Sequence, residues 1–244
     1  MSCARDWFVR LGDPGGEPVF AFPHAGGGCA QLAELARTAE VELWAANLPG
    51  RQARLSEPAW TDYPSLATTL ATELADRLDG EPYSVLGYCG GALLAYGVLR
   101  RLHAGTVPLP RRFVVVSYEA PDIAPRPRRV ADLPSDSLWD YLTDIGGVPA
   151  GLAADPRLRK VAEPAVRADF TVLAGYRHEV APPLPLPITV CYGERDGETR
   201  RGALLGWRRH TSCPLELHGV PVGHWLLDEA CGELAAILGD RTGR

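Results

Sequence analysis

One stretch of the sequence indicates the fold most directly: Tyr83-Ser84-Val85-Leu86-Gly87-Tyr88-Cys89-Gly90-Gly91-Ala92-Leu93-Leu94. Its first four residues form a short apolar run that is typical of a buried strand. From Ala92 to Leu102, apolar residues recur four positions apart, which is typical of a helix. Gly87 and Gly91 flank Cys89, where a sharp strand-to-helix turn leaves no room for side chains. The pattern matches the nucleophile elbow G-x-S-x-G, with cysteine in place of serine.

The cysteine also has a simpler interpretation, because free cysteine is often a small buried residue of a protein core. The composition is that of an ordinary globular chain: 244 residues, 23% charged and 46% hydrophobic. This length fits one domain, residues 1–244, with a substantial core. The choice between a structural and a reactive cysteine therefore depends on what the rest of the chain supplies.

Charge and hydropathy exclude several classes of function. The net charge is −5 and no basic cluster is present, which argues against nucleic-acid binding. No apolar run approaches the ~20 residues of a membrane-spanning helix, and the first residues lack the apolar core of a signal peptide. The six cysteines show no C-x-x-C spacing, so the sequence predicts neither a metal site nor a disulfide framework. We expect a cytoplasmic monomer that binds no membrane.

Short β-rich runs alternate with helical patterns, which predicts an α/β fold with a mostly parallel sheet flanked by helices. A helix is expected from Ser65 to Arg77, with Ser65 as its cap. The expected strands are Val19–Phe22, Val41–Ala46, Tyr83–Leu86, Phe113–Ser117, Ile188–Tyr192 and Leu215–Leu217. Within about residues 121–187 no strand is expected, and Ser135–Leu142 and Ala162–Tyr176 have helical patterns. Such an insertion is placed to cover the carboxyl ends of the strands, where α/β sheets bind ligands. We interpret it as a helical lid.

A reactive cysteine needs a base, and the base needs an acid to orient it. In chains with a nucleophile elbow the partners follow in the order nucleophile, acid, histidine. Asp196 comes directly after the expected strand Ile188–Tyr192, and His224 follows the last expected strand in a glycine–histidine–apolar context. The sequence therefore predicts a triad of Cys89, Asp196 and His224. The acid has alternatives in Glu119, Glu194 and Glu198.

Acyl chemistry at such a cysteine also requires two backbone N–H groups that bind an oxyanion. One is expected from the residue after the nucleophile, Gly90. The other is expected from the loop after the first expected strand, which reads Phe22-Pro23-His24-Ala25-Gly26-Gly27-Gly28-Cys29. A glycine run after a strand is a weak signal by itself, since such loops also cradle phosphates. Paired with the elbow, it predicts an oxyanion hole formed by Ala25 and Gly90.

These motifs together resemble the type II thioesterases that serve nonribosomal peptide and polyketide synthases, and the resemblance covers nearly the whole chain. Residues 22–27 are similar to the family's oxyanion loop, residues 164–170 to its lid helix motif, and Gly223-His224 to its histidine segment. Residues 48–58 are similar to the pattern L-P-G-R-x-x-R-x-x-E-P. In these segments we interpret Arg51, Arg54 and the pair of Arg167 and Asp169 as loop and lid salt bridges.

The resemblance implies an α/β-hydrolase fold and activity on thioesters held by the phosphopantetheine arm of acyl or peptidyl carrier proteins. No cofactor is expected beyond that arm, which belongs to the partner. The elbow departs from the family's usual G-H-S-M-G, because it reads Gly87-Tyr88-Cys89-Gly90-Gly91. Tyr88 and Gly90 are expected to reshape the floor of the pocket, and Tyr88 and His24 to contact the substrate.

The sequence favours a thioesterase that hydrolyses carrier-bound acyl, aminoacyl or peptidyl thioesters through an acyl group held on Cys89. A thiol beside an imidazole forms a thiolate readily, and the resulting acyl-cysteine is itself a thioester. An acyltransferase that moves acyl groups between carriers or to an amine, or that releases a cyclic product, is therefore the alternative. A third possibility, from a different class, is a non-catalytic partner that binds carrier proteins.

Overall fold

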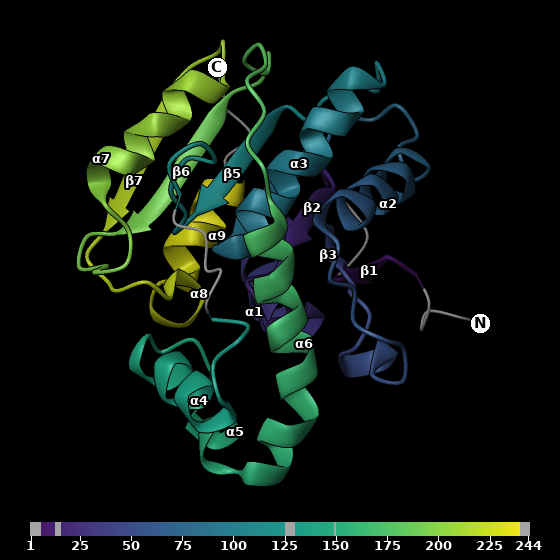
Figure 1. Ribbon diagram of the computed structural model, residues 1–244. Helices are drawn as coiled ribbons and strands as arrows, with labels where there is room; N and C mark the ends of the chain where they lie inside the picture. The colour runs from purple at the N-terminus through teal and green to yellow at the C-terminus, as the bar shows by residue number, and fades with distance from the viewer. Residues whose placement is uncertain (1–5, 13–15, 125–129, 149, 240–244) are drawn as a thin grey trace.

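The computed structural model describes residues 6–12, 16–124, 130–148 and 150–239, which form a central sheet with helices on both faces (Figure 1). Among these residues the sheet has seven strands in the order β1-β3-β2-β4-β5-β6-β7. All neighbours pair in parallel except β1 with β3. The strands are β1 (Phe8–Leu11), β2 (Val19–Phe22), β3 (Leu43–Ala46), β4 (Ser84–Tyr88), β5 (Arg112–Val116), β6 (Ile188–Gly193) and β7 (Leu215–Val220). The predicted fold class, a mostly parallel α/β sheet of the α/β-hydrolase type, is confirmed.

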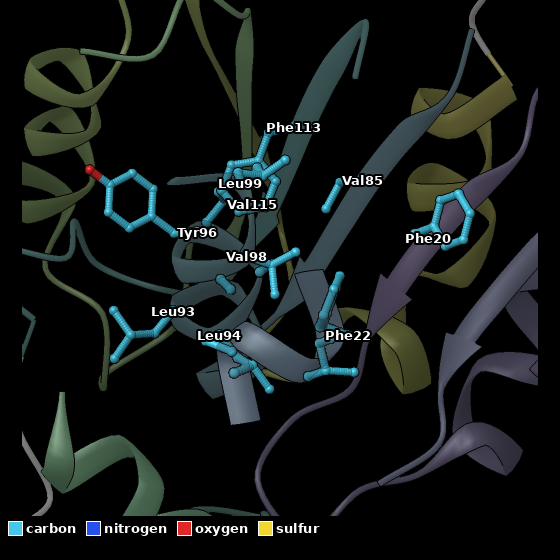
Figure 2. Close-up of a cluster of buried hydrophobic side chains, with 14 of the residues drawn as sticks. Phe20, Phe22, Val85, Leu93, Leu94, Tyr96, Val98, Leu99, Phe113 and Val115 are labelled. Carbon is cyan, nitrogen blue, oxygen red and sulfur yellow. The ribbon is translucent and has the colours of Figure 1, made fainter. Parts of the chain in front are cut away.

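Two pairs of helices cover the two faces of the sheet. On one face α2 (Tyr63–Ala75) packs beside α3 (Gly90–Ala104), and on the other α1 (Cys29–Ala39) packs beside α9 (Cys231–Gly239) (Figure 1). Because side chains alternate along a strand, Val85 joins the core under α3 whereas Leu86 joins the core under α1. Figure 2 shows the first of these cores, where apolar side chains of α3 lie against those of β2, β4 and β5.

The segment between β5 and β6 contains α4 (Ser135–Asp144), α5 (Ala150–Ala154) and the long α6 (Pro156–Gly175). In Figure 1, α4 and α5 lie beyond the carboxyl ends of the strands, and α6 runs from there up along α3. A separate apolar cluster joins Leu138 and Trp139 of α4 to Val166 and Phe170 of α6. In its described part the segment forms one isolated bridge, Leu184 with Thr211, and no strand.

The remaining helical elements are short and connect the larger ones. They are the 3-10 turns η1 (Gln52–Arg54) and η2 (Leu205–His210) and the helices α7 (Arg201–Leu204) and α8 (Leu226–Glu229). Among the described residues, no helix has both the length and the apolar character that crossing a membrane requires.

Several local predictions differ from the structure; the helix expected at Ala162–Tyr176, for example, begins at Pro156 and ends at Gly175. The edge strand β1 was not expected, because its four residues have only one buried side chain and so give no clear alternation. The helix expected to be capped by Ser65 begins at Tyr63, and its cap is Asp62, whose carboxylate accepts the Ser65 N–H at 2.9 Å. Pro64 in the first turn is compatible with this earlier start, since proline suits a position whose N–H has no partner in the helix.

Two glycines allow the chain to turn from β4 into α3. A side chain at Gly87 would collide with the backbone of Ala92, and one at Gly91 with the carbonyl oxygens of Phe22 and Pro23. The start of α3 is therefore in contact with both β4 and the end of β2. This contact requires glycine for reasons of space.

We predict that Gly91→Ala lowers the free energy of unfolding by about 3 kcal/mol, because the added methyl group must push β2 and α3 apart. Gly232→Ala is the matched control: it lies in α9 with no atom within 4 Å of the added Cβ, and alanine in a helix gains about 0.5–1 kcal/mol over glycine. Urea denaturation of both variants checks this. Equal stability of the two would contradict the close packing described for the elbow.

Candidate active site

Cys89 lies at the apex of the turn between β4 and α3, with φ of 48° and ψ of −127°. Residues other than glycine rarely adopt a positive φ. The Cys89 N–H donates to the Val116 carbonyl at 2.8 Å, and its carbonyl accepts the Ala92 N–H at 2.8 Å, so both sides of the strained residue are held. Backbone strain of this kind collects at functional sites. The thiol is half-buried and lines a cavity at the carboxyl ends of the strands.

His224 and Asp196 come together from the loops that follow β7 and β6. These loops touch, because Gly193 is so close to the Gly223 carbonyl that no side chain fits between them. The Asp196 carboxylate contacts the Nδ1 atom of His224 at 2.8 Å. It also accepts the Thr199 hydroxyl at 2.6 Å and the Glu198 N–H at 2.8 Å. The orientation of the carboxylate is thus fixed by three partners.

The charges of the two partners stabilise each other. Burial opposes ionisation of Asp196, but hydrogen bonds from His224 and Thr199 outweigh it and lower the pKa of the carboxyl group. Burial likewise disfavours the imidazolium of His224, yet hydrogen bonds to Asp196 and Cys89 raise its pKa to about 10. His224 therefore carries its proton at neutral pH and faces both the acid and the thiol.

The other candidate acids are engaged elsewhere or point away. Glu119 is buried and binds Arg200, with the side-chain nitrogens at 2.8 and 2.9 Å and the backbone N–H at 2.9 Å. Burial alone would raise the pKa of Glu119, and the hydrogen bonds from Arg200 lower it below its usual value. Glu198 contributes its backbone N–H to Asp196, and the Glu194 side chain lies near Gly219. Asp196 is the carboxylate that contacts His224.

Among the described residues, no protein group accepts the Ala25 N–H of the loop after β2, as an oxyanion donor requires. Three of the four amides that follow His24 have acceptors: Gly26 donates to Asp169 at 2.7 Å, Gly27 to the His24 carbonyl at 2.9 Å, and Gly28 to Gln31 at 2.8 Å. The fourth amide belongs to Ala25, and Ala25 and Gly90 line the same cavity as Cys89. The geometry is compatible with the predicted oxyanion hole.

The cavity beside Cys89 measures about 860 Å³ including its opening to solvent. The helices α4 and α6, together with Ile145 just after α4, form its apolar wall; the helical residues are Tyr141, Leu142, Phe170 and Leu173. Its polar side contains Ser117, Glu119, Glu198 and Thr199, and none of its described lining residues is arginine or lysine. Within the described ranges, no three metal-binding side chains come together as a metal site.

His24 lines the cavity and Tyr88 does not. The His24 ring packs edge-on against Tyr88 and Trp225, with centroids 5.6 and 5.0 Å away. Burial lowers the pKa of His24 to about 4, so the ring is neutral. Tyr88 was expected to contact the substrate, but its side chain is fully buried beneath His24 and Trp225. As the neighbour of Cys89 at the end of β4 it shares the face of Leu86, which points into the core under α1.

The predicted loop and lid salt bridges are present, but Arg167 and Asp169 pair with other residues and not with each other. Arg54 pairs with Glu57 at 2.6 Å, as a loop salt bridge. Arg167 and Asp169 do not pair with each other, because residues two apart point to different sides of a helix. Arg167 instead pairs with Glu163 on α6 at 2.7 Å, and Asp169 pairs with Arg51.

Several residues of the site were not singled out in the sequence. Thr199 and Ser117 hold the triad by donating to Asp196 and to the His224 carbonyl, the latter at 2.9 Å. Thr199 has the spacing of a local turn, three residues after Asp196, and that signal was available. Tyr141 and Trp225 reach the cavity only through the packing of α4 and α8, which no local pattern encodes.

Comparisons with known proteins identify the family of the chain. A family model described as "Thioesterase domain" matches residues 17–242, and the chain therefore belongs to the thioesterase family. The chain is 26% identical over 242 residues to the gramicidin S biosynthesis protein GrsT of Aneurinibacillus migulanus, with 98% of this chain and 94% of that protein covered. The family membership confirms the resemblance noted in the sequence and the expected enzyme class, a thioester hydrolase.

The chain is also similar to part of a longer protein and to a solved structure. The chain is 34% identical over 240 residues to the AMB antimetabolite synthetase AmbE of Pseudomonas aeruginosa; the match covers 96% of this chain and 11% of AmbE, so the chain spans about a tenth of that protein's length. The structure of the type II thioesterase BorB from the borrelidin biosynthetic cluster superposes with a TM-score of 0.87 at 26% identity, covering 98% of each chain.

We predict that His224 makes stability fall as the pH rises from about 6.5 to about 10. The pKa of His224 is raised from 6.5 to about 10 in the folded chain, so within this window the folded state keeps on His224 a proton that the same side chain releases in the unfolded state. The stabilisation is complete below pH 6.5 and is lost as the pH passes 10. The measurement is the free energy of unfolding against pH for the wild type and His224→Gln; parallel curves for the two would contradict the raised pKa.

Proposed function

We propose that this chain hydrolyses acyl thioesters carried on the phosphopantetheine arm of carrier proteins in natural-product biosynthesis, with Cys89 as the nucleophile. The observation that carries the proposal is that Cys89 and His224 line one cavity together with Ala25 and Gly90, while Asp196 contacts His224 from behind. GrsT is a gramicidin S biosynthesis protein and BorB is a type II thioesterase of a borrelidin cluster. Their similarity to this chain supports the same kind of pathway and a carrier domain as partner.

The first step transfers the acyl group to the enzyme. The Cys89 sulfur attacks the thioester carbonyl and forms a carbon–sulfur bond, while His224 holds the proton of the thiol. The negative charge that develops on the carbonyl oxygen is bound by the amides of Ala25 and Gly90. The intermediate then collapses, the bond to the pantetheine sulfur breaks, and His224 gives its proton to the departing thiolate.

The second step releases the acid. After the first step His224 is neutral and accepts a proton from a water molecule, whose oxygen attacks the acyl-cysteine. The same two amides bind the second oxyanion. When the carbon–sulfur bond breaks, the carboxylic acid leaves and the sulfur and imidazolium are restored as a pair. Asp196 stays ionised throughout and holds the ring in the required orientation.

A second candidate function, acyl transfer, follows from the use of sulfur as the nucleophile in place of oxygen. An acyl-cysteine is a thioester, so transfer to the thiol of another carrier is nearly balanced in free energy, whereas transfer from an acyl-serine to a thiol runs uphill. Acyl transfer between carriers, transfer to an amine or cyclising release therefore competes with hydrolysis at Cys89. A non-catalytic partner that only binds carriers would need no ordered triad, which makes it the weakest of the three readings.

The charged side chains that line the cavity affect which acyl groups it should bind. Of its two carboxylates, Glu119 is neutralised by Arg200. Glu198 lies at the rim, close enough to Tyr141 that its charge acts on the Tyr141 hydroxyl. Within the described part of the chain no basic group lies within ion-pair distance of Glu198. The site should therefore favour acyl groups with a protonated amine and disfavour those with a second carboxylate.

The proposal is tested with Cys89→Ala, a carrier loaded with an acyl thioester and an assay for free acid. We expect the turnover number to fall at least about 10³-fold, since loss of a nucleophile removes covalent catalysis, while affinity for the loaded carrier is kept. Cys89→Ala with full hydrolysis would show that another residue does the chemistry. Loss of carrier binding together with turnover would point to a folding defect, which thermal denaturation detects.

Cys89→Ser tests the role of sulfur. We predict that serine raises the ratio of hydrolysis to acyl transfer, because an oxygen ester is not poised for exchange with a thiol. The measurement follows the acyl group from a loaded carrier to free acid and to a second, unloaded carrier. An unchanged ratio of hydrolysis to acyl transfer in Cys89→Ser would contradict the argument that an acyl-cysteine exchanges readily with another thiol.

Glu198→Gln tests the charge preference. Alanyl and isobutyryl thioesters have nearly the same shape and differ by the protonated amine, so we predict that the variant loses about fivefold in kcat/KM for the alanyl thioester alone. Activity toward the isobutyryl thioester is the internal control. An equal change for both substrates would mean that Glu198 does not select by charge.

A further inference from the structure

The lid helix α6 contacts both halves of the oxyanion hole. Asp169 of α6 accepts the Gly26 N–H at 2.7 Å, next to the Ala25 amide. One turn further along the same face, Leu173 lies against Gly90, where an added Cβ would stand 2.6 Å from the Leu173 Cδ1 atom. Residues four apart on a helix lie on one face. A single rigid helix therefore spans the two amides of the proposed hole.

Arg51 also connects α6 to the loop after β2. Its guanidinium forms two hydrogen bonds with the Asp169 carboxylate, one of them at 2.6 Å, and a third with the Gly27 carbonyl at 3.0 Å. Both side chains are at least nine-tenths buried. The loop is thus held by an N–H and a carbonyl on the two residues that follow Ala25. We call this arrangement of Arg51, Asp169, Gly26 and Gly27 the loop clamp.

Stability alone does not account for a buried ion pair here. Taking both charges out of water is costly, and replacing such pairs by apolar side chains of similar volume is often neutral or stabilising. The pair instead fixes orientation: Arg51 and Asp169 bind each other in a bidentate fashion. Each also makes one hydrogen bond to the loop, Arg51 to the Gly27 carbonyl and Asp169 from the Gly26 N–H. Gly26 is further pressed against Val166 of α6, at 2.9 Å from an added Cβ, and has a φ of 78°. These contacts therefore fix the position of the loop after β2 relative to α6.

We propose that Arg51 and Asp169 are positioning residues for the oxyanion hole, through which lid helix α6 sets the direction of the Ala25 N–H. The inference rests on the proposed acyl chemistry at Cys89. Neither side chain is among those that line the cavity of Cys89, so both act through the backbone of residues 25–27. Because oxyanion donors work only when aligned with the charge of the transition state, the clamp affects the chemical steps more than the binding of substrate.

The test replaces the clamp by an apolar pair, Arg51→Met with Asp169→Leu, so that no buried charge is left alone. The matched control is Arg54→Met with Glu57→Leu, which removes the neighbouring ion pair of the same segment. We expect kcat for a pantetheine thioester to fall about 100-fold in the clamp variant, with KM changed less than threefold and with thermal stability kept. The control keeps kcat. An unchanged kcat in a folded clamp variant overturns the proposal.

Two ligands separate alignment of the hole from general damage. A pantetheine analogue with a trifluoromethyl ketone in place of the thioester forms a tetrahedral adduct with Cys89, and the matching amide binds without reaction. The clamp variant should lose affinity for the ketone by the same factor as kcat/KM and retain affinity for the amide. Equal losses for both ligands would mean that the pair only shapes the pocket. If the apolar pair does not fold, the same two ligands are measured on Asp169→Asn, which keeps the shape of the side chain.

The proposed function and the clamp fail in different ways. Wild-type protein that neither hydrolyses the thioester nor binds the ketone contradicts the acyl chemistry itself. Wild-type protein that does both, beside a clamp variant that also does both, contradicts only the positioning role of Arg51 and Asp169.

Discussion

The close contact between the start of α3 and the end of β2 is the constraint on which the site depends. It requires Gly87 and Gly91, and Cys89 between them has a positive φ and is held by hydrogen bonds with Val116 and Ala92. The same contact brings the loop after β2 beside the amide of Gly90. One steric arrangement therefore exposes the thiol and places the two amides of the proposed oxyanion hole around it.

The two sides of the cavity have different origins. The loops at the carboxyl ends of the strands supply the proposed catalytic groups, since those after β6 and β7 bring Asp196 to His224. The helical segment between β5 and β6 supplies the apolar wall and, through Asp169, a direct connection to the oxyanion loop. In this arrangement the segment that forms the apolar wall of the cavity is also attached to the loop of the proposed oxyanion hole. Under the proposed mechanism, α6 links the fit of the substrate to the alignment of the oxyanion hole.

The fold followed from local patterns, because strands, glycines and helices are encoded within a few residues of one another. The triad residues were found in the same way, each lying just after an expected strand, and the structure brings them together. The position of Tyr88 was not predicted. Its place beside Cys89 in the sequence suggested a side chain in the pocket, but the face of β4 on which it lies points into the core. The pairing of Asp169 with Arg51 joins segments far apart in the chain, and the local signal pointed instead to Arg167. Contacts between distant segments were the part that local patterns did not contain.

The central claim is that the acyl group passes through the sulfur of Cys89. Intact-protein mass spectrometry, after rapid mixing of the enzyme with an acyl-loaded carrier and an unloaded second carrier, tests it directly. The account predicts a transient acyl adduct that peptide mapping places on Cys89, followed by free acid while both carriers end unloaded. Acyl mass that accumulates on the second carrier with little free acid would make the protein a transferase. Free acid that forms with no adduct on Cys89 at any time would contradict the mechanism.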